Sequence, residues 1–286
     1  MADRRIPAVL SIAGSDSGGG AGIQADLKAF AHCGVHGMTA ITALTAQSTV
    51  GVTGVLPVPG DFIVDQVRAV AEDIGVDAVK IGMLGTADIV HAVREALGLL
   101  EPGTPVVIDP VMVAESGAVL LDDAARAALV DELLPVASVI TPNVPEARVL
   151  VGEGAQASAD EDDADALARA LVALGPDAVV VTGGHRERPT DVFFDGDTLE
   201  HIEGERHEDG AAHGSGCTHS SALAAHLALG YTPLDAARKA KAIASEAVRN
   251  GLRDIGEGAG PVDVLGLTAA RRPAEPPPAL WHNRPR

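Results

Sequence analysis

Short runs of Val, Ile and Ala residues alternate along most of this chain with longer amphipathic stretches, which restricts the folds it can adopt. Short β-branched runs between turn residues predict buried strands, and apolar residues spaced three or four apart predict helices. Strands that alternate with helices build βαβ units, in which helices cover both faces of a mainly parallel sheet. We therefore expect a doubly wound α/β domain.

The predicted elements follow one another in a regular order. Strands are predicted over residues 8–13, 38–45, 78–81, 106–108, 138–140 and 178–181, and helices over residues 23–32, 61–74, 86–99, 122–133, 162–174, 217–229 and 233–250. Residues 192–202 alternate apolar and polar side chains around an Asp-Gly-Asp turn, which predicts a small β-hairpin at the edge of the sheet.

The chain contains no repeat and no Ser/Gly-rich linker, so we expect a single domain over residues 1–270. Residues 271–286 are rich in Pro and Arg and contain too few apolar side chains to form a core. We predict that this tail is disordered.

The composition argues against several classes of partner. The formal net charge is −19, whereas a nucleic-acid-binding protein needs a basic surface. Such an acidic surface suits high salt, where screening removes self-repulsion. No apolar run reaches the roughly 18 residues of a membrane-spanning helix, and the first residues do not resemble a signal peptide. We expect a cytoplasmic protein that binds neither nucleic acid nor membrane.

A glycine-rich segment, residues 14–22, follows the first predicted strand and precedes a helix. Ligands gather at the carboxyl ends of strands in open α/β sheets. The dinucleotide fingerprint GxGxxG fails here because Ser17 stands at its first glycine, and the chain has no Gly-Lys pair for a Walker A loop. A turn that binds no ligand is the plainer interpretation of this segment alone.

A second glycine cluster, comprising Gly214, Ser215, Gly216 and Cys217, opens a helix rich in Ala. Backbone amides at a helix start, together with the helix dipole, form an anion site, and glycines let a phosphate approach closely. Cys217 then stands where a general base belongs, and a helix N-terminus can lower the pKa of a thiol and leave a usable thiolate. The alternative is an inert, buried helix cysteine.

Polar residues follow three further predicted strands. Asp109 and Glu146 offer the oxygen ligands that Mg²⁺ prefers, and we predict them as its ligands, although Glu146 could simply begin a helix. The remaining residues of this group, which we predict to contact nucleotide phosphates, are Asn143, Thr182, Gly183, Gly184 and His185.

Six motifs in order resemble one known family. They are residues 13–28 (AGSDSGGGAGIQADLK), 42–47 (TALTAQ), 80–84 (KIGML), 109–113 (DPVMV), 141–143 (TPN) and 214–218 (GSGCT). Together they closely resemble hydroxymethylpyrimidine/phosphomethylpyrimidine kinases, thiamine-biosynthesis enzymes of the ribokinase-like superfamily. The resemblance spans about residues 6–265.

The resemblance implies an ATP- and Mg²⁺-dependent kinase that phosphorylates 4-amino-5-hydroxymethyl-2-methylpyrimidine and then its monophosphate. It implies that Cys217 is the base, and that Gln47 pairs with the amino edge of the ring. It places around the ring Gly14, Met83, Val111 and Met112. Asp26 and Lys241 are predicted to contact substrate and nucleotide, with solvated helix charges as the alternative. The resemblance also suggests a homodimer.

The sequence departs from the family pattern at two positions, and three alternative functions remain. Ser215 stands where Thr is more usual and Ser48 follows Gln47 where Asn is common, and the second change could alter ring selectivity. The first alternative is a pyridoxine, pyridoxal or pyridoxamine kinase, for which Gln47 is the discriminating residue. A ligand sensor without catalysis, and a nicotinamide-dependent oxidoreductase on a similar sheet, are the others.

Overall fold

The computed structural model describes residues 6–113, 120–152, 164–183, 189–207 and 210–268. Its centre is one nine-stranded sheet in the order β3-β2-β1-β4-β5-β6-β7-β8-β9. The strands from β2 to β7 in this order are parallel, whereas β3, β8 and β9 pair in antiparallel fashion at the two edges. This topology confirms the predicted doubly wound sheet and its edge hairpin.

The strand bounds are β1 (Ala8–Ser15), β2 (His36–Ser48), β3 (Gly51–Pro57), β4 (Ala78–Ile81), β5 (Val106–Ile108), β6 (Val139–Ile140), β7 (Ala178–Val181), β8 (Asp191–Phe194) and β9 (Leu199–Ile202). The helix bounds are α1 (Gly22–His32), α2 (Gly60–Asp73), α3 (Ala87–Leu97), α4 (Asp123–Ala128), α5 (Val144–Val151), α6 (Ala164–Val172), α7 (Ser215–Ala228) and α8 (Pro233–Arg249).

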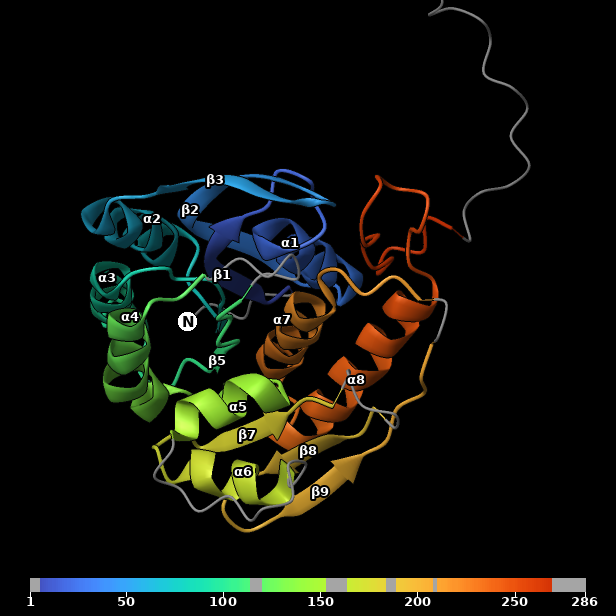
Figure 1. Cartoon of the computed structure of the whole chain (residues 1–286). Coiled ribbons are helices and arrows are strands. Elements are labelled where there is room, and N and C mark those ends of the chain that lie inside the picture. Colours follow the sequence, from blue (N-terminus) through green and yellow to red (C-terminus); the bar gives the residue numbers. More distant parts are fainter. Residues whose placement is uncertain (1–5, 114–119, 153–163, 184–188, 208–209, 269–286) are drawn as a thin grey trace, which may run out of the picture.

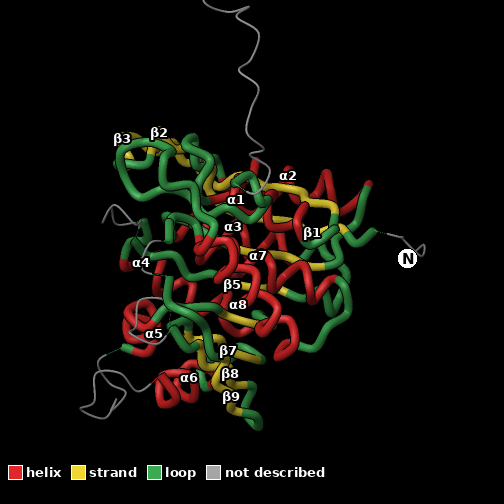
Figure 2. Tube along the Cα trace, turned by 90° about the vertical axis from the view of Figure 1, so that its right-hand side faces the viewer, coloured by secondary structure: helices red, strands yellow, loops and turns green. Residues whose placement is uncertain are grey.

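Helices cover both faces of the sheet. The elements from α2 to α6 pack on one face, where the core is built mostly from Val, Ile, Leu and Ala. On the other face α1, α7 and α8 enclose a second core that includes Phe30 and Phe193. Its α7 and α8 positions are largely alanines, which let the two helices approach closely. Figures 1 and 2 show β2 and β3 at one end of the molecule and β7 to β9 at the other.

The chain order of the strands places a ligand site at the centre of the sheet. From β1 the chain first adds β2 on one side and later adds β4 on the other. Ligands of open α/β sheets bind at the carboxyl ends of the strands where the direction of winding reverses in this way. Gly14, near the end of β1, and Met83, in the loop that follows β4, lie at that point.

Some elements differ from the sequence-based expectation. Strand β3 is unpredicted, because its mixed, largely exposed residues lack a buried face. Helix α5 was expected only as the alternative in which Glu146 begins a helix, since it is short and has Pro145 in its first turn. The helix expected over 122–133 ends at Ala128 and continues as a π-helical turn (Leu129–Leu133) and a 3₁₀ turn (Leu134–Val136) that contains Pro135.

Two other expectations concern the boundary of the domain and the absence of a membrane-spanning helix. Residues 269–286 lie outside the described residues, so the domain boundary at 270 and the disordered tail stay predictions. Across the described ranges, no helix is both long and apolar enough to cross a membrane.

We predict that Phe30→Ala lowers the free energy of unfolding by about 3–5 kcal/mol, because a fully buried aromatic ring is replaced by a cavity. Phe62→Ala on α2 is the matched control, since Phe62 is 58% exposed, and should change stability by less than about 0.5 kcal/mol. Urea unfolding followed by circular dichroism measures both. Equal losses in the two variants would contradict the described core.

Candidate active site

Asp16 organises the glycine loop that follows β1. Its buried carboxylate accepts hydrogen bonds from the backbone amides of Gly18 (2.8 Å), Gly20 (3.0 Å) and Ala21 (2.8 Å). Burial alone would raise the pKa of Asp16, but hydrogen bonds from His213 and from these amides lower it below its usual range. Asp16 was not identified as functional from the sequence, where it looked like one more loop residue.

The glycine loop lies against the segment that precedes α7. The His213 Nε2 atom is 3.2 Å from Asp16 Oδ2. A Cβ atom at Gly20 would collide with the His213 ring, and one at Gly214 would collide with the carbonyl oxygen of Gly20. Gly214 also has a φ of +82°, a conformation that favours glycine. Both glycine clusters predicted from the sequence are therefore parts of one site.

Helix α7 begins with the predicted anion loop. Gly214 is its N-cap and supplies no side-chain oxygen to the first amides. Ser215, Gly216 and Cys217 form the first turn, in which the Ser215 amide donates to the Ala212 carbonyl oxygen (2.9 Å). The amides of Gly216 and Cys217, together with the helix dipole, favour an anion. The Gly22 amide, from the start of α1, makes a hydrogen bond to the Cys217 sulfur. The sulfur thus lies where the two glycine loops meet.

A fully buried ion pair lies beneath this turn. Lys80 Nζ on β4 is 2.9 Å from Asp26 Oδ1 on α1, and both side chains have 0% exposure. The hydroxyls of Ser11 and Ser221 donate hydrogen bonds of 2.6 Å and 2.7 Å to the same carboxylate. Burial lowers the pKa of Lys80, but the charges of Asp26 and Asp109 and the hydrogen bond to Asp26 are among the contributions that together outweigh it, so the net shift is upward. Lys80 is therefore a cation in the protein.

These contacts correct the expectation for Asp26. We predicted a substrate contact or a solvated helix charge, but both of its carboxylate oxygens are occupied by buried partners. Asp26 acts from below the site, because it joins α1 to β1, β4 and α7. The sequence assigned no role to Lys80, since its partner is distant along the chain.

Asp109, predicted as a metal ligand, lies next to this ion pair. Its Oδ2 atom accepts a hydrogen bond of 3.0 Å from Ser220 on α7 and is 4.0 Å from Lys80 Nζ. The side chain follows β5 and is almost completely buried. Burial raises the pKa of Asp109, and the Lys80 charge only partly opposes this shift. A buried carboxylate of this kind is stabilised when a cation binds beside it.

Glu146 and Asn143 form the start of α5. Glu146 Oε2 accepts a hydrogen bond from the Asn143 amide, and Asn143 Oδ1 accepts one from the Glu146 amide, so the two residues form a capping box. Burial, and next the charge of Asp109, raise the pKa of Glu146 to about 7. The carboxylates of Glu146 and Asp109 are thus close enough to interact electrostatically. The helix-start role is real, and it leaves oxygen lone pairs for a ligand.

Cys217 is a thiol in the ligand-free protein. Burial raises its pKa to about 12, although the charge of Lys80 and the Gly22 amide lower it. The expectation that the helix start would produce a thiolate is therefore wrong for this state, because loss of hydration outweighs the dipole. The residue as a whole keeps partial exposure, so it is not packed wholly within the core.

The predicted nucleotide residues lie on the other side of α7. Thr182 and Gly183 follow β7, and the Thr182 segment forms a bridge with Asn143, so these three residues come together. Gly183 donates a hydrogen bond of 3.0 Å from its amide to Asp191 Oδ1. Gly184 and His185 lie outside the described residues.

Lys241 is also held by the carboxylate of Asp191. Its Nζ atom donates a hydrogen bond of 2.6 Å to Asp191 Oδ1, so it is not the solvated helix charge that the sequence left as an alternative. His219 Nε2 on α7 is 3.5 Å from Asp191 Oδ2. Burial lowers the pKa of His219 in spite of Asp191, which keeps this ring neutral. Asp191 was missed in the sequence because its partners come from separate elements.

The predicted ring-binding residues lie near the carboxyl ends of β1, β2 and β4. A Cβ atom at Gly14 would be 2.6 Å from Met83 Cε, so this glycine leaves room for the methionine. Gln47 on β2 is half-buried, as is Val111. Met112 belongs to the buried core on the α2–α6 face, so its side chain is less accessible than we expected.

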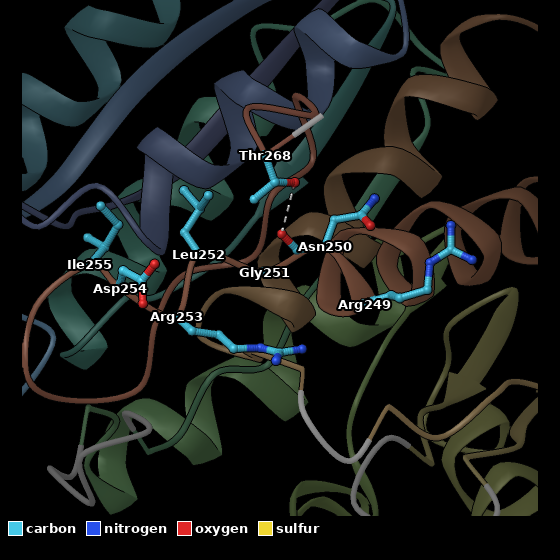
Figure 3. Close-up of a pocket in the computed structure, with 8 residues that line it drawn as sticks. All are labelled: Arg249, Asn250, Gly251, Leu252, Arg253, Asp254, Ile255 and Thr268. Carbon is cyan, nitrogen blue, oxygen red and sulfur yellow. Dashed lines mark hydrogen bonds between the residues drawn. The ribbon is translucent and has the colours of Figure 1, made fainter. Parts of the chain in front are cut away.

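Two hollows flank α8. One of about 410 Å³ lies between the segment after β9 and α8, and Lys241 is part of its lining. The other, of about 460 Å³, lies at the end of α8 and is shown in Figure 3. Its lining residues are Arg249, Asn250, Gly251, Leu252, Arg253, Asp254, Ile255 and Thr268. Only the first hollow includes a residue that we predicted as functional.

Comparisons with known proteins agree on one family. A profile described as phosphomethylpyrimidine kinase matches residues 16–263. A hydroxymethylpyrimidine/phosphomethylpyrimidine kinase of Rhizobium meliloti is 48% identical and covers 88% of this chain and 95% of its own length. Phosphomethylpyrimidine kinase from Clostridium difficile has a TM-score of 0.72 and 39% identity, covering 85% and 99% of the two chains. Pyridoxal kinase from Staphylococcus aureus, in complex with AMP-PCP and pyridoxal, has a TM-score of 0.81 and 34% identity, covering 91% and 94%.

An open sheet with an anion-binding helix start and buried carboxylates at its carboxyl edge is the arrangement of a small-molecule kinase with the ribokinase-like fold. Within that class, the chain belongs to the phosphomethylpyrimidine kinase family. The family resemblance seen in the sequence is confirmed.

We predict that Lys80→Met lowers the free energy of unfolding by about 3–5 kcal/mol, because it leaves Asp26 buried without its cation. The double variant Asp26→Asn/Lys80→Met should recover part of this loss, since no uncompensated charge remains. Urea unfolding measures both variants, with Arg238→Ala in an exposed ion pair as a control that should change little. A double variant less stable than Lys80→Met would contradict the assignment.

The raised thiol pKa values give a second prediction. Burial also raises the pKa of Cys33 to about 11, so at pH 7 to 9 both cysteines are thiols and should react slowly with iodoacetamide. Because the thiolate fraction grows as pH rises towards the pKa, each rate should increase about tenfold per pH unit up to about pH 10. Peptide mapping by mass spectrometry follows each residue. A Cys217 rate that levels off below pH 9 would show that the thiolate forms without ligand.

Proposed function

We propose that this protein transfers the γ-phosphoryl group of ATP to 4-amino-5-hydroxymethyl-2-methylpyrimidine and then to its monophosphate, yielding the diphosphate used in thiamine biosynthesis. The family membership supports this reaction. The observation that carries it in the structure is the uncapped first turn of α7, with Cys217 above the Lys80–Asp26 pair and beside the glycine loop.

The first turn of α7 is suited to stabilising the phosphoryl group in transit. A phosphoryl transfer needs mainly alignment of the two oxygens and stabilisation of charge on the moving group. The amides of Gly216 and Cys217 would contact that group, since the Ser215 amide already donates to the Ala212 carbonyl oxygen. Gly214 and Gly216 let the group approach the backbone. The nearby cation Lys80 favours negative charge in the same region.

Cys217 is proposed as the base that accepts the proton of the hydroxymethyl group. It must first lose its own proton, because it is a thiol without ligands. Lys80 and the Gly22 amide are the groups that favour the thiolate. The acceptor alcohol would therefore lie between the sulfur and the amides of the α7 turn.

ATP and Mg²⁺ are the proposed cosubstrate and metal. A structural neighbour bound to AMP-PCP supports an ATP site, and Asn143, Thr182, Gly183 and Lys241 are the described residues that we propose to border it. Asp109 and Glu146 would hold the magnesium ion, which would neutralise charge on the phosphates.

A vitamin B6 kinase is the alternative, because pyridoxal kinases share the fold. The two reactions differ in the ring rather than in the chemistry. Gln47 favours the pyrimidine, since a carboxamide can both donate to and accept from an aminopyrimidine edge. Turnover of the pyrimidine, its monophosphate and pyridoxal, measured with ATP by phosphorus NMR at several salt concentrations, tests this choice. Faster phosphorylation of pyridoxal than of either pyrimidine would overturn the proposal.

We also propose a homodimer. Leu44 on β2 and Leu56 on β3 are cross-strand partners with 45% and 64% exposure. Apolar side chains gathered at an edge strand are the kind of surface that a second copy can cover.

We predict that Cys217→Ala lowers kcat by about 10²- to 10⁴-fold with little change in the affinity for ATP, because it removes a base that does not contact the nucleotide base or ribose. Steady-state kinetics and ATP titration by calorimetry separate the two effects. Cys33→Ala is the matched control and should retain wild-type turnover. Unchanged kcat in Cys217→Ala would exclude the thiol from the mechanism.

A further inference from the structure

The side chain of Gln47 makes a close contact whose hydrogen-bond direction can be worked out. Thr45 Oγ1 is 2.8 Å from the carbonyl oxygen of Ser15 and 3.2 Å from the Oε1 atom of Gln47. Thr45 and Gln47 both lie on β2, and both are half-buried. The Thr45 hydroxyl therefore faces two oxygen atoms, and both are hydrogen-bond acceptors.

A threonine hydroxyl has a single hydrogen, so it can donate to only one of them. The backbone carbonyl of Ser15 can only accept, and its contact is the shorter one. The carboxamide of Gln47 has an oxygen at one end and an NH₂ group at the other, and rotation by 180° exchanges them without changing shape. With the NH₂ group towards Thr45, every group in the chain from Gln47 to Ser15 has a suitable partner.

We propose that Thr45 is a specificity-determining positioning residue, whose hydroxyl accepts from the Gln47 NH₂ group and so determines which end of that amide faces each part of the substrate. The inference rests on the proposed pyrimidine kinase function and assigns to it a residue that does not itself contact the ring.

The backbone of Gln47 is already held in place, which leaves only the amide orientation to be settled. The Ser17 hydroxyl donates to the backbone carbonyl oxygen of Gln47 (2.6 Å) and accepts from the backbone N–H of Gln47 (2.8 Å). The pairing of β2 with β3 shifts register here, because Ala46 opposes Gly54 and Gln47 opposes Val52. Such bulges re-aim side chains at sites.

The fixed amide has a chemical consequence for ring recognition. One N–H of the NH₂ group is used by Thr45, so the carbonyl oxygen and the other N–H remain side by side. They match an exocyclic amino group, which donates, and the adjacent ring nitrogen, which accepts. A 4-aminopyrimidine has this pair of groups next to its hydroxymethyl substituent. Because the side-chain amide of Gln47 cannot rotate by 180°, the ring can bind in only one orientation within its plane.

The vitamin B6 ring lacks that pair. The pyridoxal ring carries a methyl, a hydroxyl, an aldehyde and a hydroxymethyl group, and it has no amino group beside the ring nitrogen. A fixed Gln47 amide would then leave one of its polar groups without a partner, which disfavours binding. The Thr45 hydroxyl thus acts on selectivity through Gln47.

The test compares Thr45→Val, which keeps the shape but removes the hydroxyl, with Thr45→Ser, which keeps the hydroxyl. Each is assayed with the aminopyrimidine and with 5-hydroxymethyl-2-methylpyrimidine, which lacks the amino group. We expect Thr45→Val to lower kcat/KM for the aminopyrimidine by about 10- to 100-fold, the scale of one misplaced hydrogen bond. Thr45→Ser should stay within about threefold of wild type, and the analogue should show no difference between the variants.

A different pattern would overturn the inference. An equal loss on both substrates in Thr45→Val would mean that the hydroxyl only supports the fold, and no loss on either would mean that it does not orient Gln47. If Thr45→Val does not fold, as judged by thermal unfolding, Thr45→Ala takes its place in the same comparison. Failure of the wild-type protein to phosphorylate the aminopyrimidine would instead overturn the proposed function, and so is distinguishable from these outcomes.

Discussion

The ion pair between Lys80 and Asp26 is the interaction on which the rest of the site depends. Removing two charges from water costs several kcal/mol for each ion, and only close partners offset that cost. Here Ser11 and Ser221 complete the pair, so β1, β4, α1 and α7 can meet at this point in one arrangement. The start of α7, with its amides and Cys217, takes its position from that arrangement.

Two other buried carboxylates repeat this design at the edges of the site. Asp16 gathers the glycine loop and joins it to His213 before α7. Asp191 joins the turn after β7 to Lys241 on α8 and approaches His219 on α7. Each carboxylate lies beneath a loop that we propose to contact a ligand. The loops are therefore held in place by buried carboxylates from separate parts of the chain.

The ring that is phosphorylated is not decided by the fold. Pyridoxal kinase and phosphomethylpyrimidine kinase structures are both close neighbours of this chain. A shared sheet and a shared anion-binding turn provide the same phosphoryl transfer for either ring. Selectivity must then come from the few side chains that meet the heterocycle, and we propose that Gln47, oriented by Thr45, is the most specific of them.

Much of the architecture could be predicted from the sequence. The Val- and Ile-rich strand segments and the glycine clusters are local features, so they identified the parallel sheet, the edge hairpin and the anion-binding helix start. Strand β3 escaped prediction because it lacks a buried face. Helix α5 entered only as an alternative, because it is short and has a proline in its first turn. The roles of the site residues were harder to predict, because the sequence does not show whether a charged side chain on a helix is solvated or buried.

The amino-acid order by itself thus determined which segments become strands and helices, and which glycine turns can approach a phosphate. Only the tertiary structure decided that Asp26 meets Lys80, that Asp16 meets His213 and that burial keeps Cys217 a thiol. The reason is physical. The periodicity of apolar residues indicates which side chains are buried. The partners of a side chain and its pKa depend instead on groups that only folding brings together from distant parts of the chain.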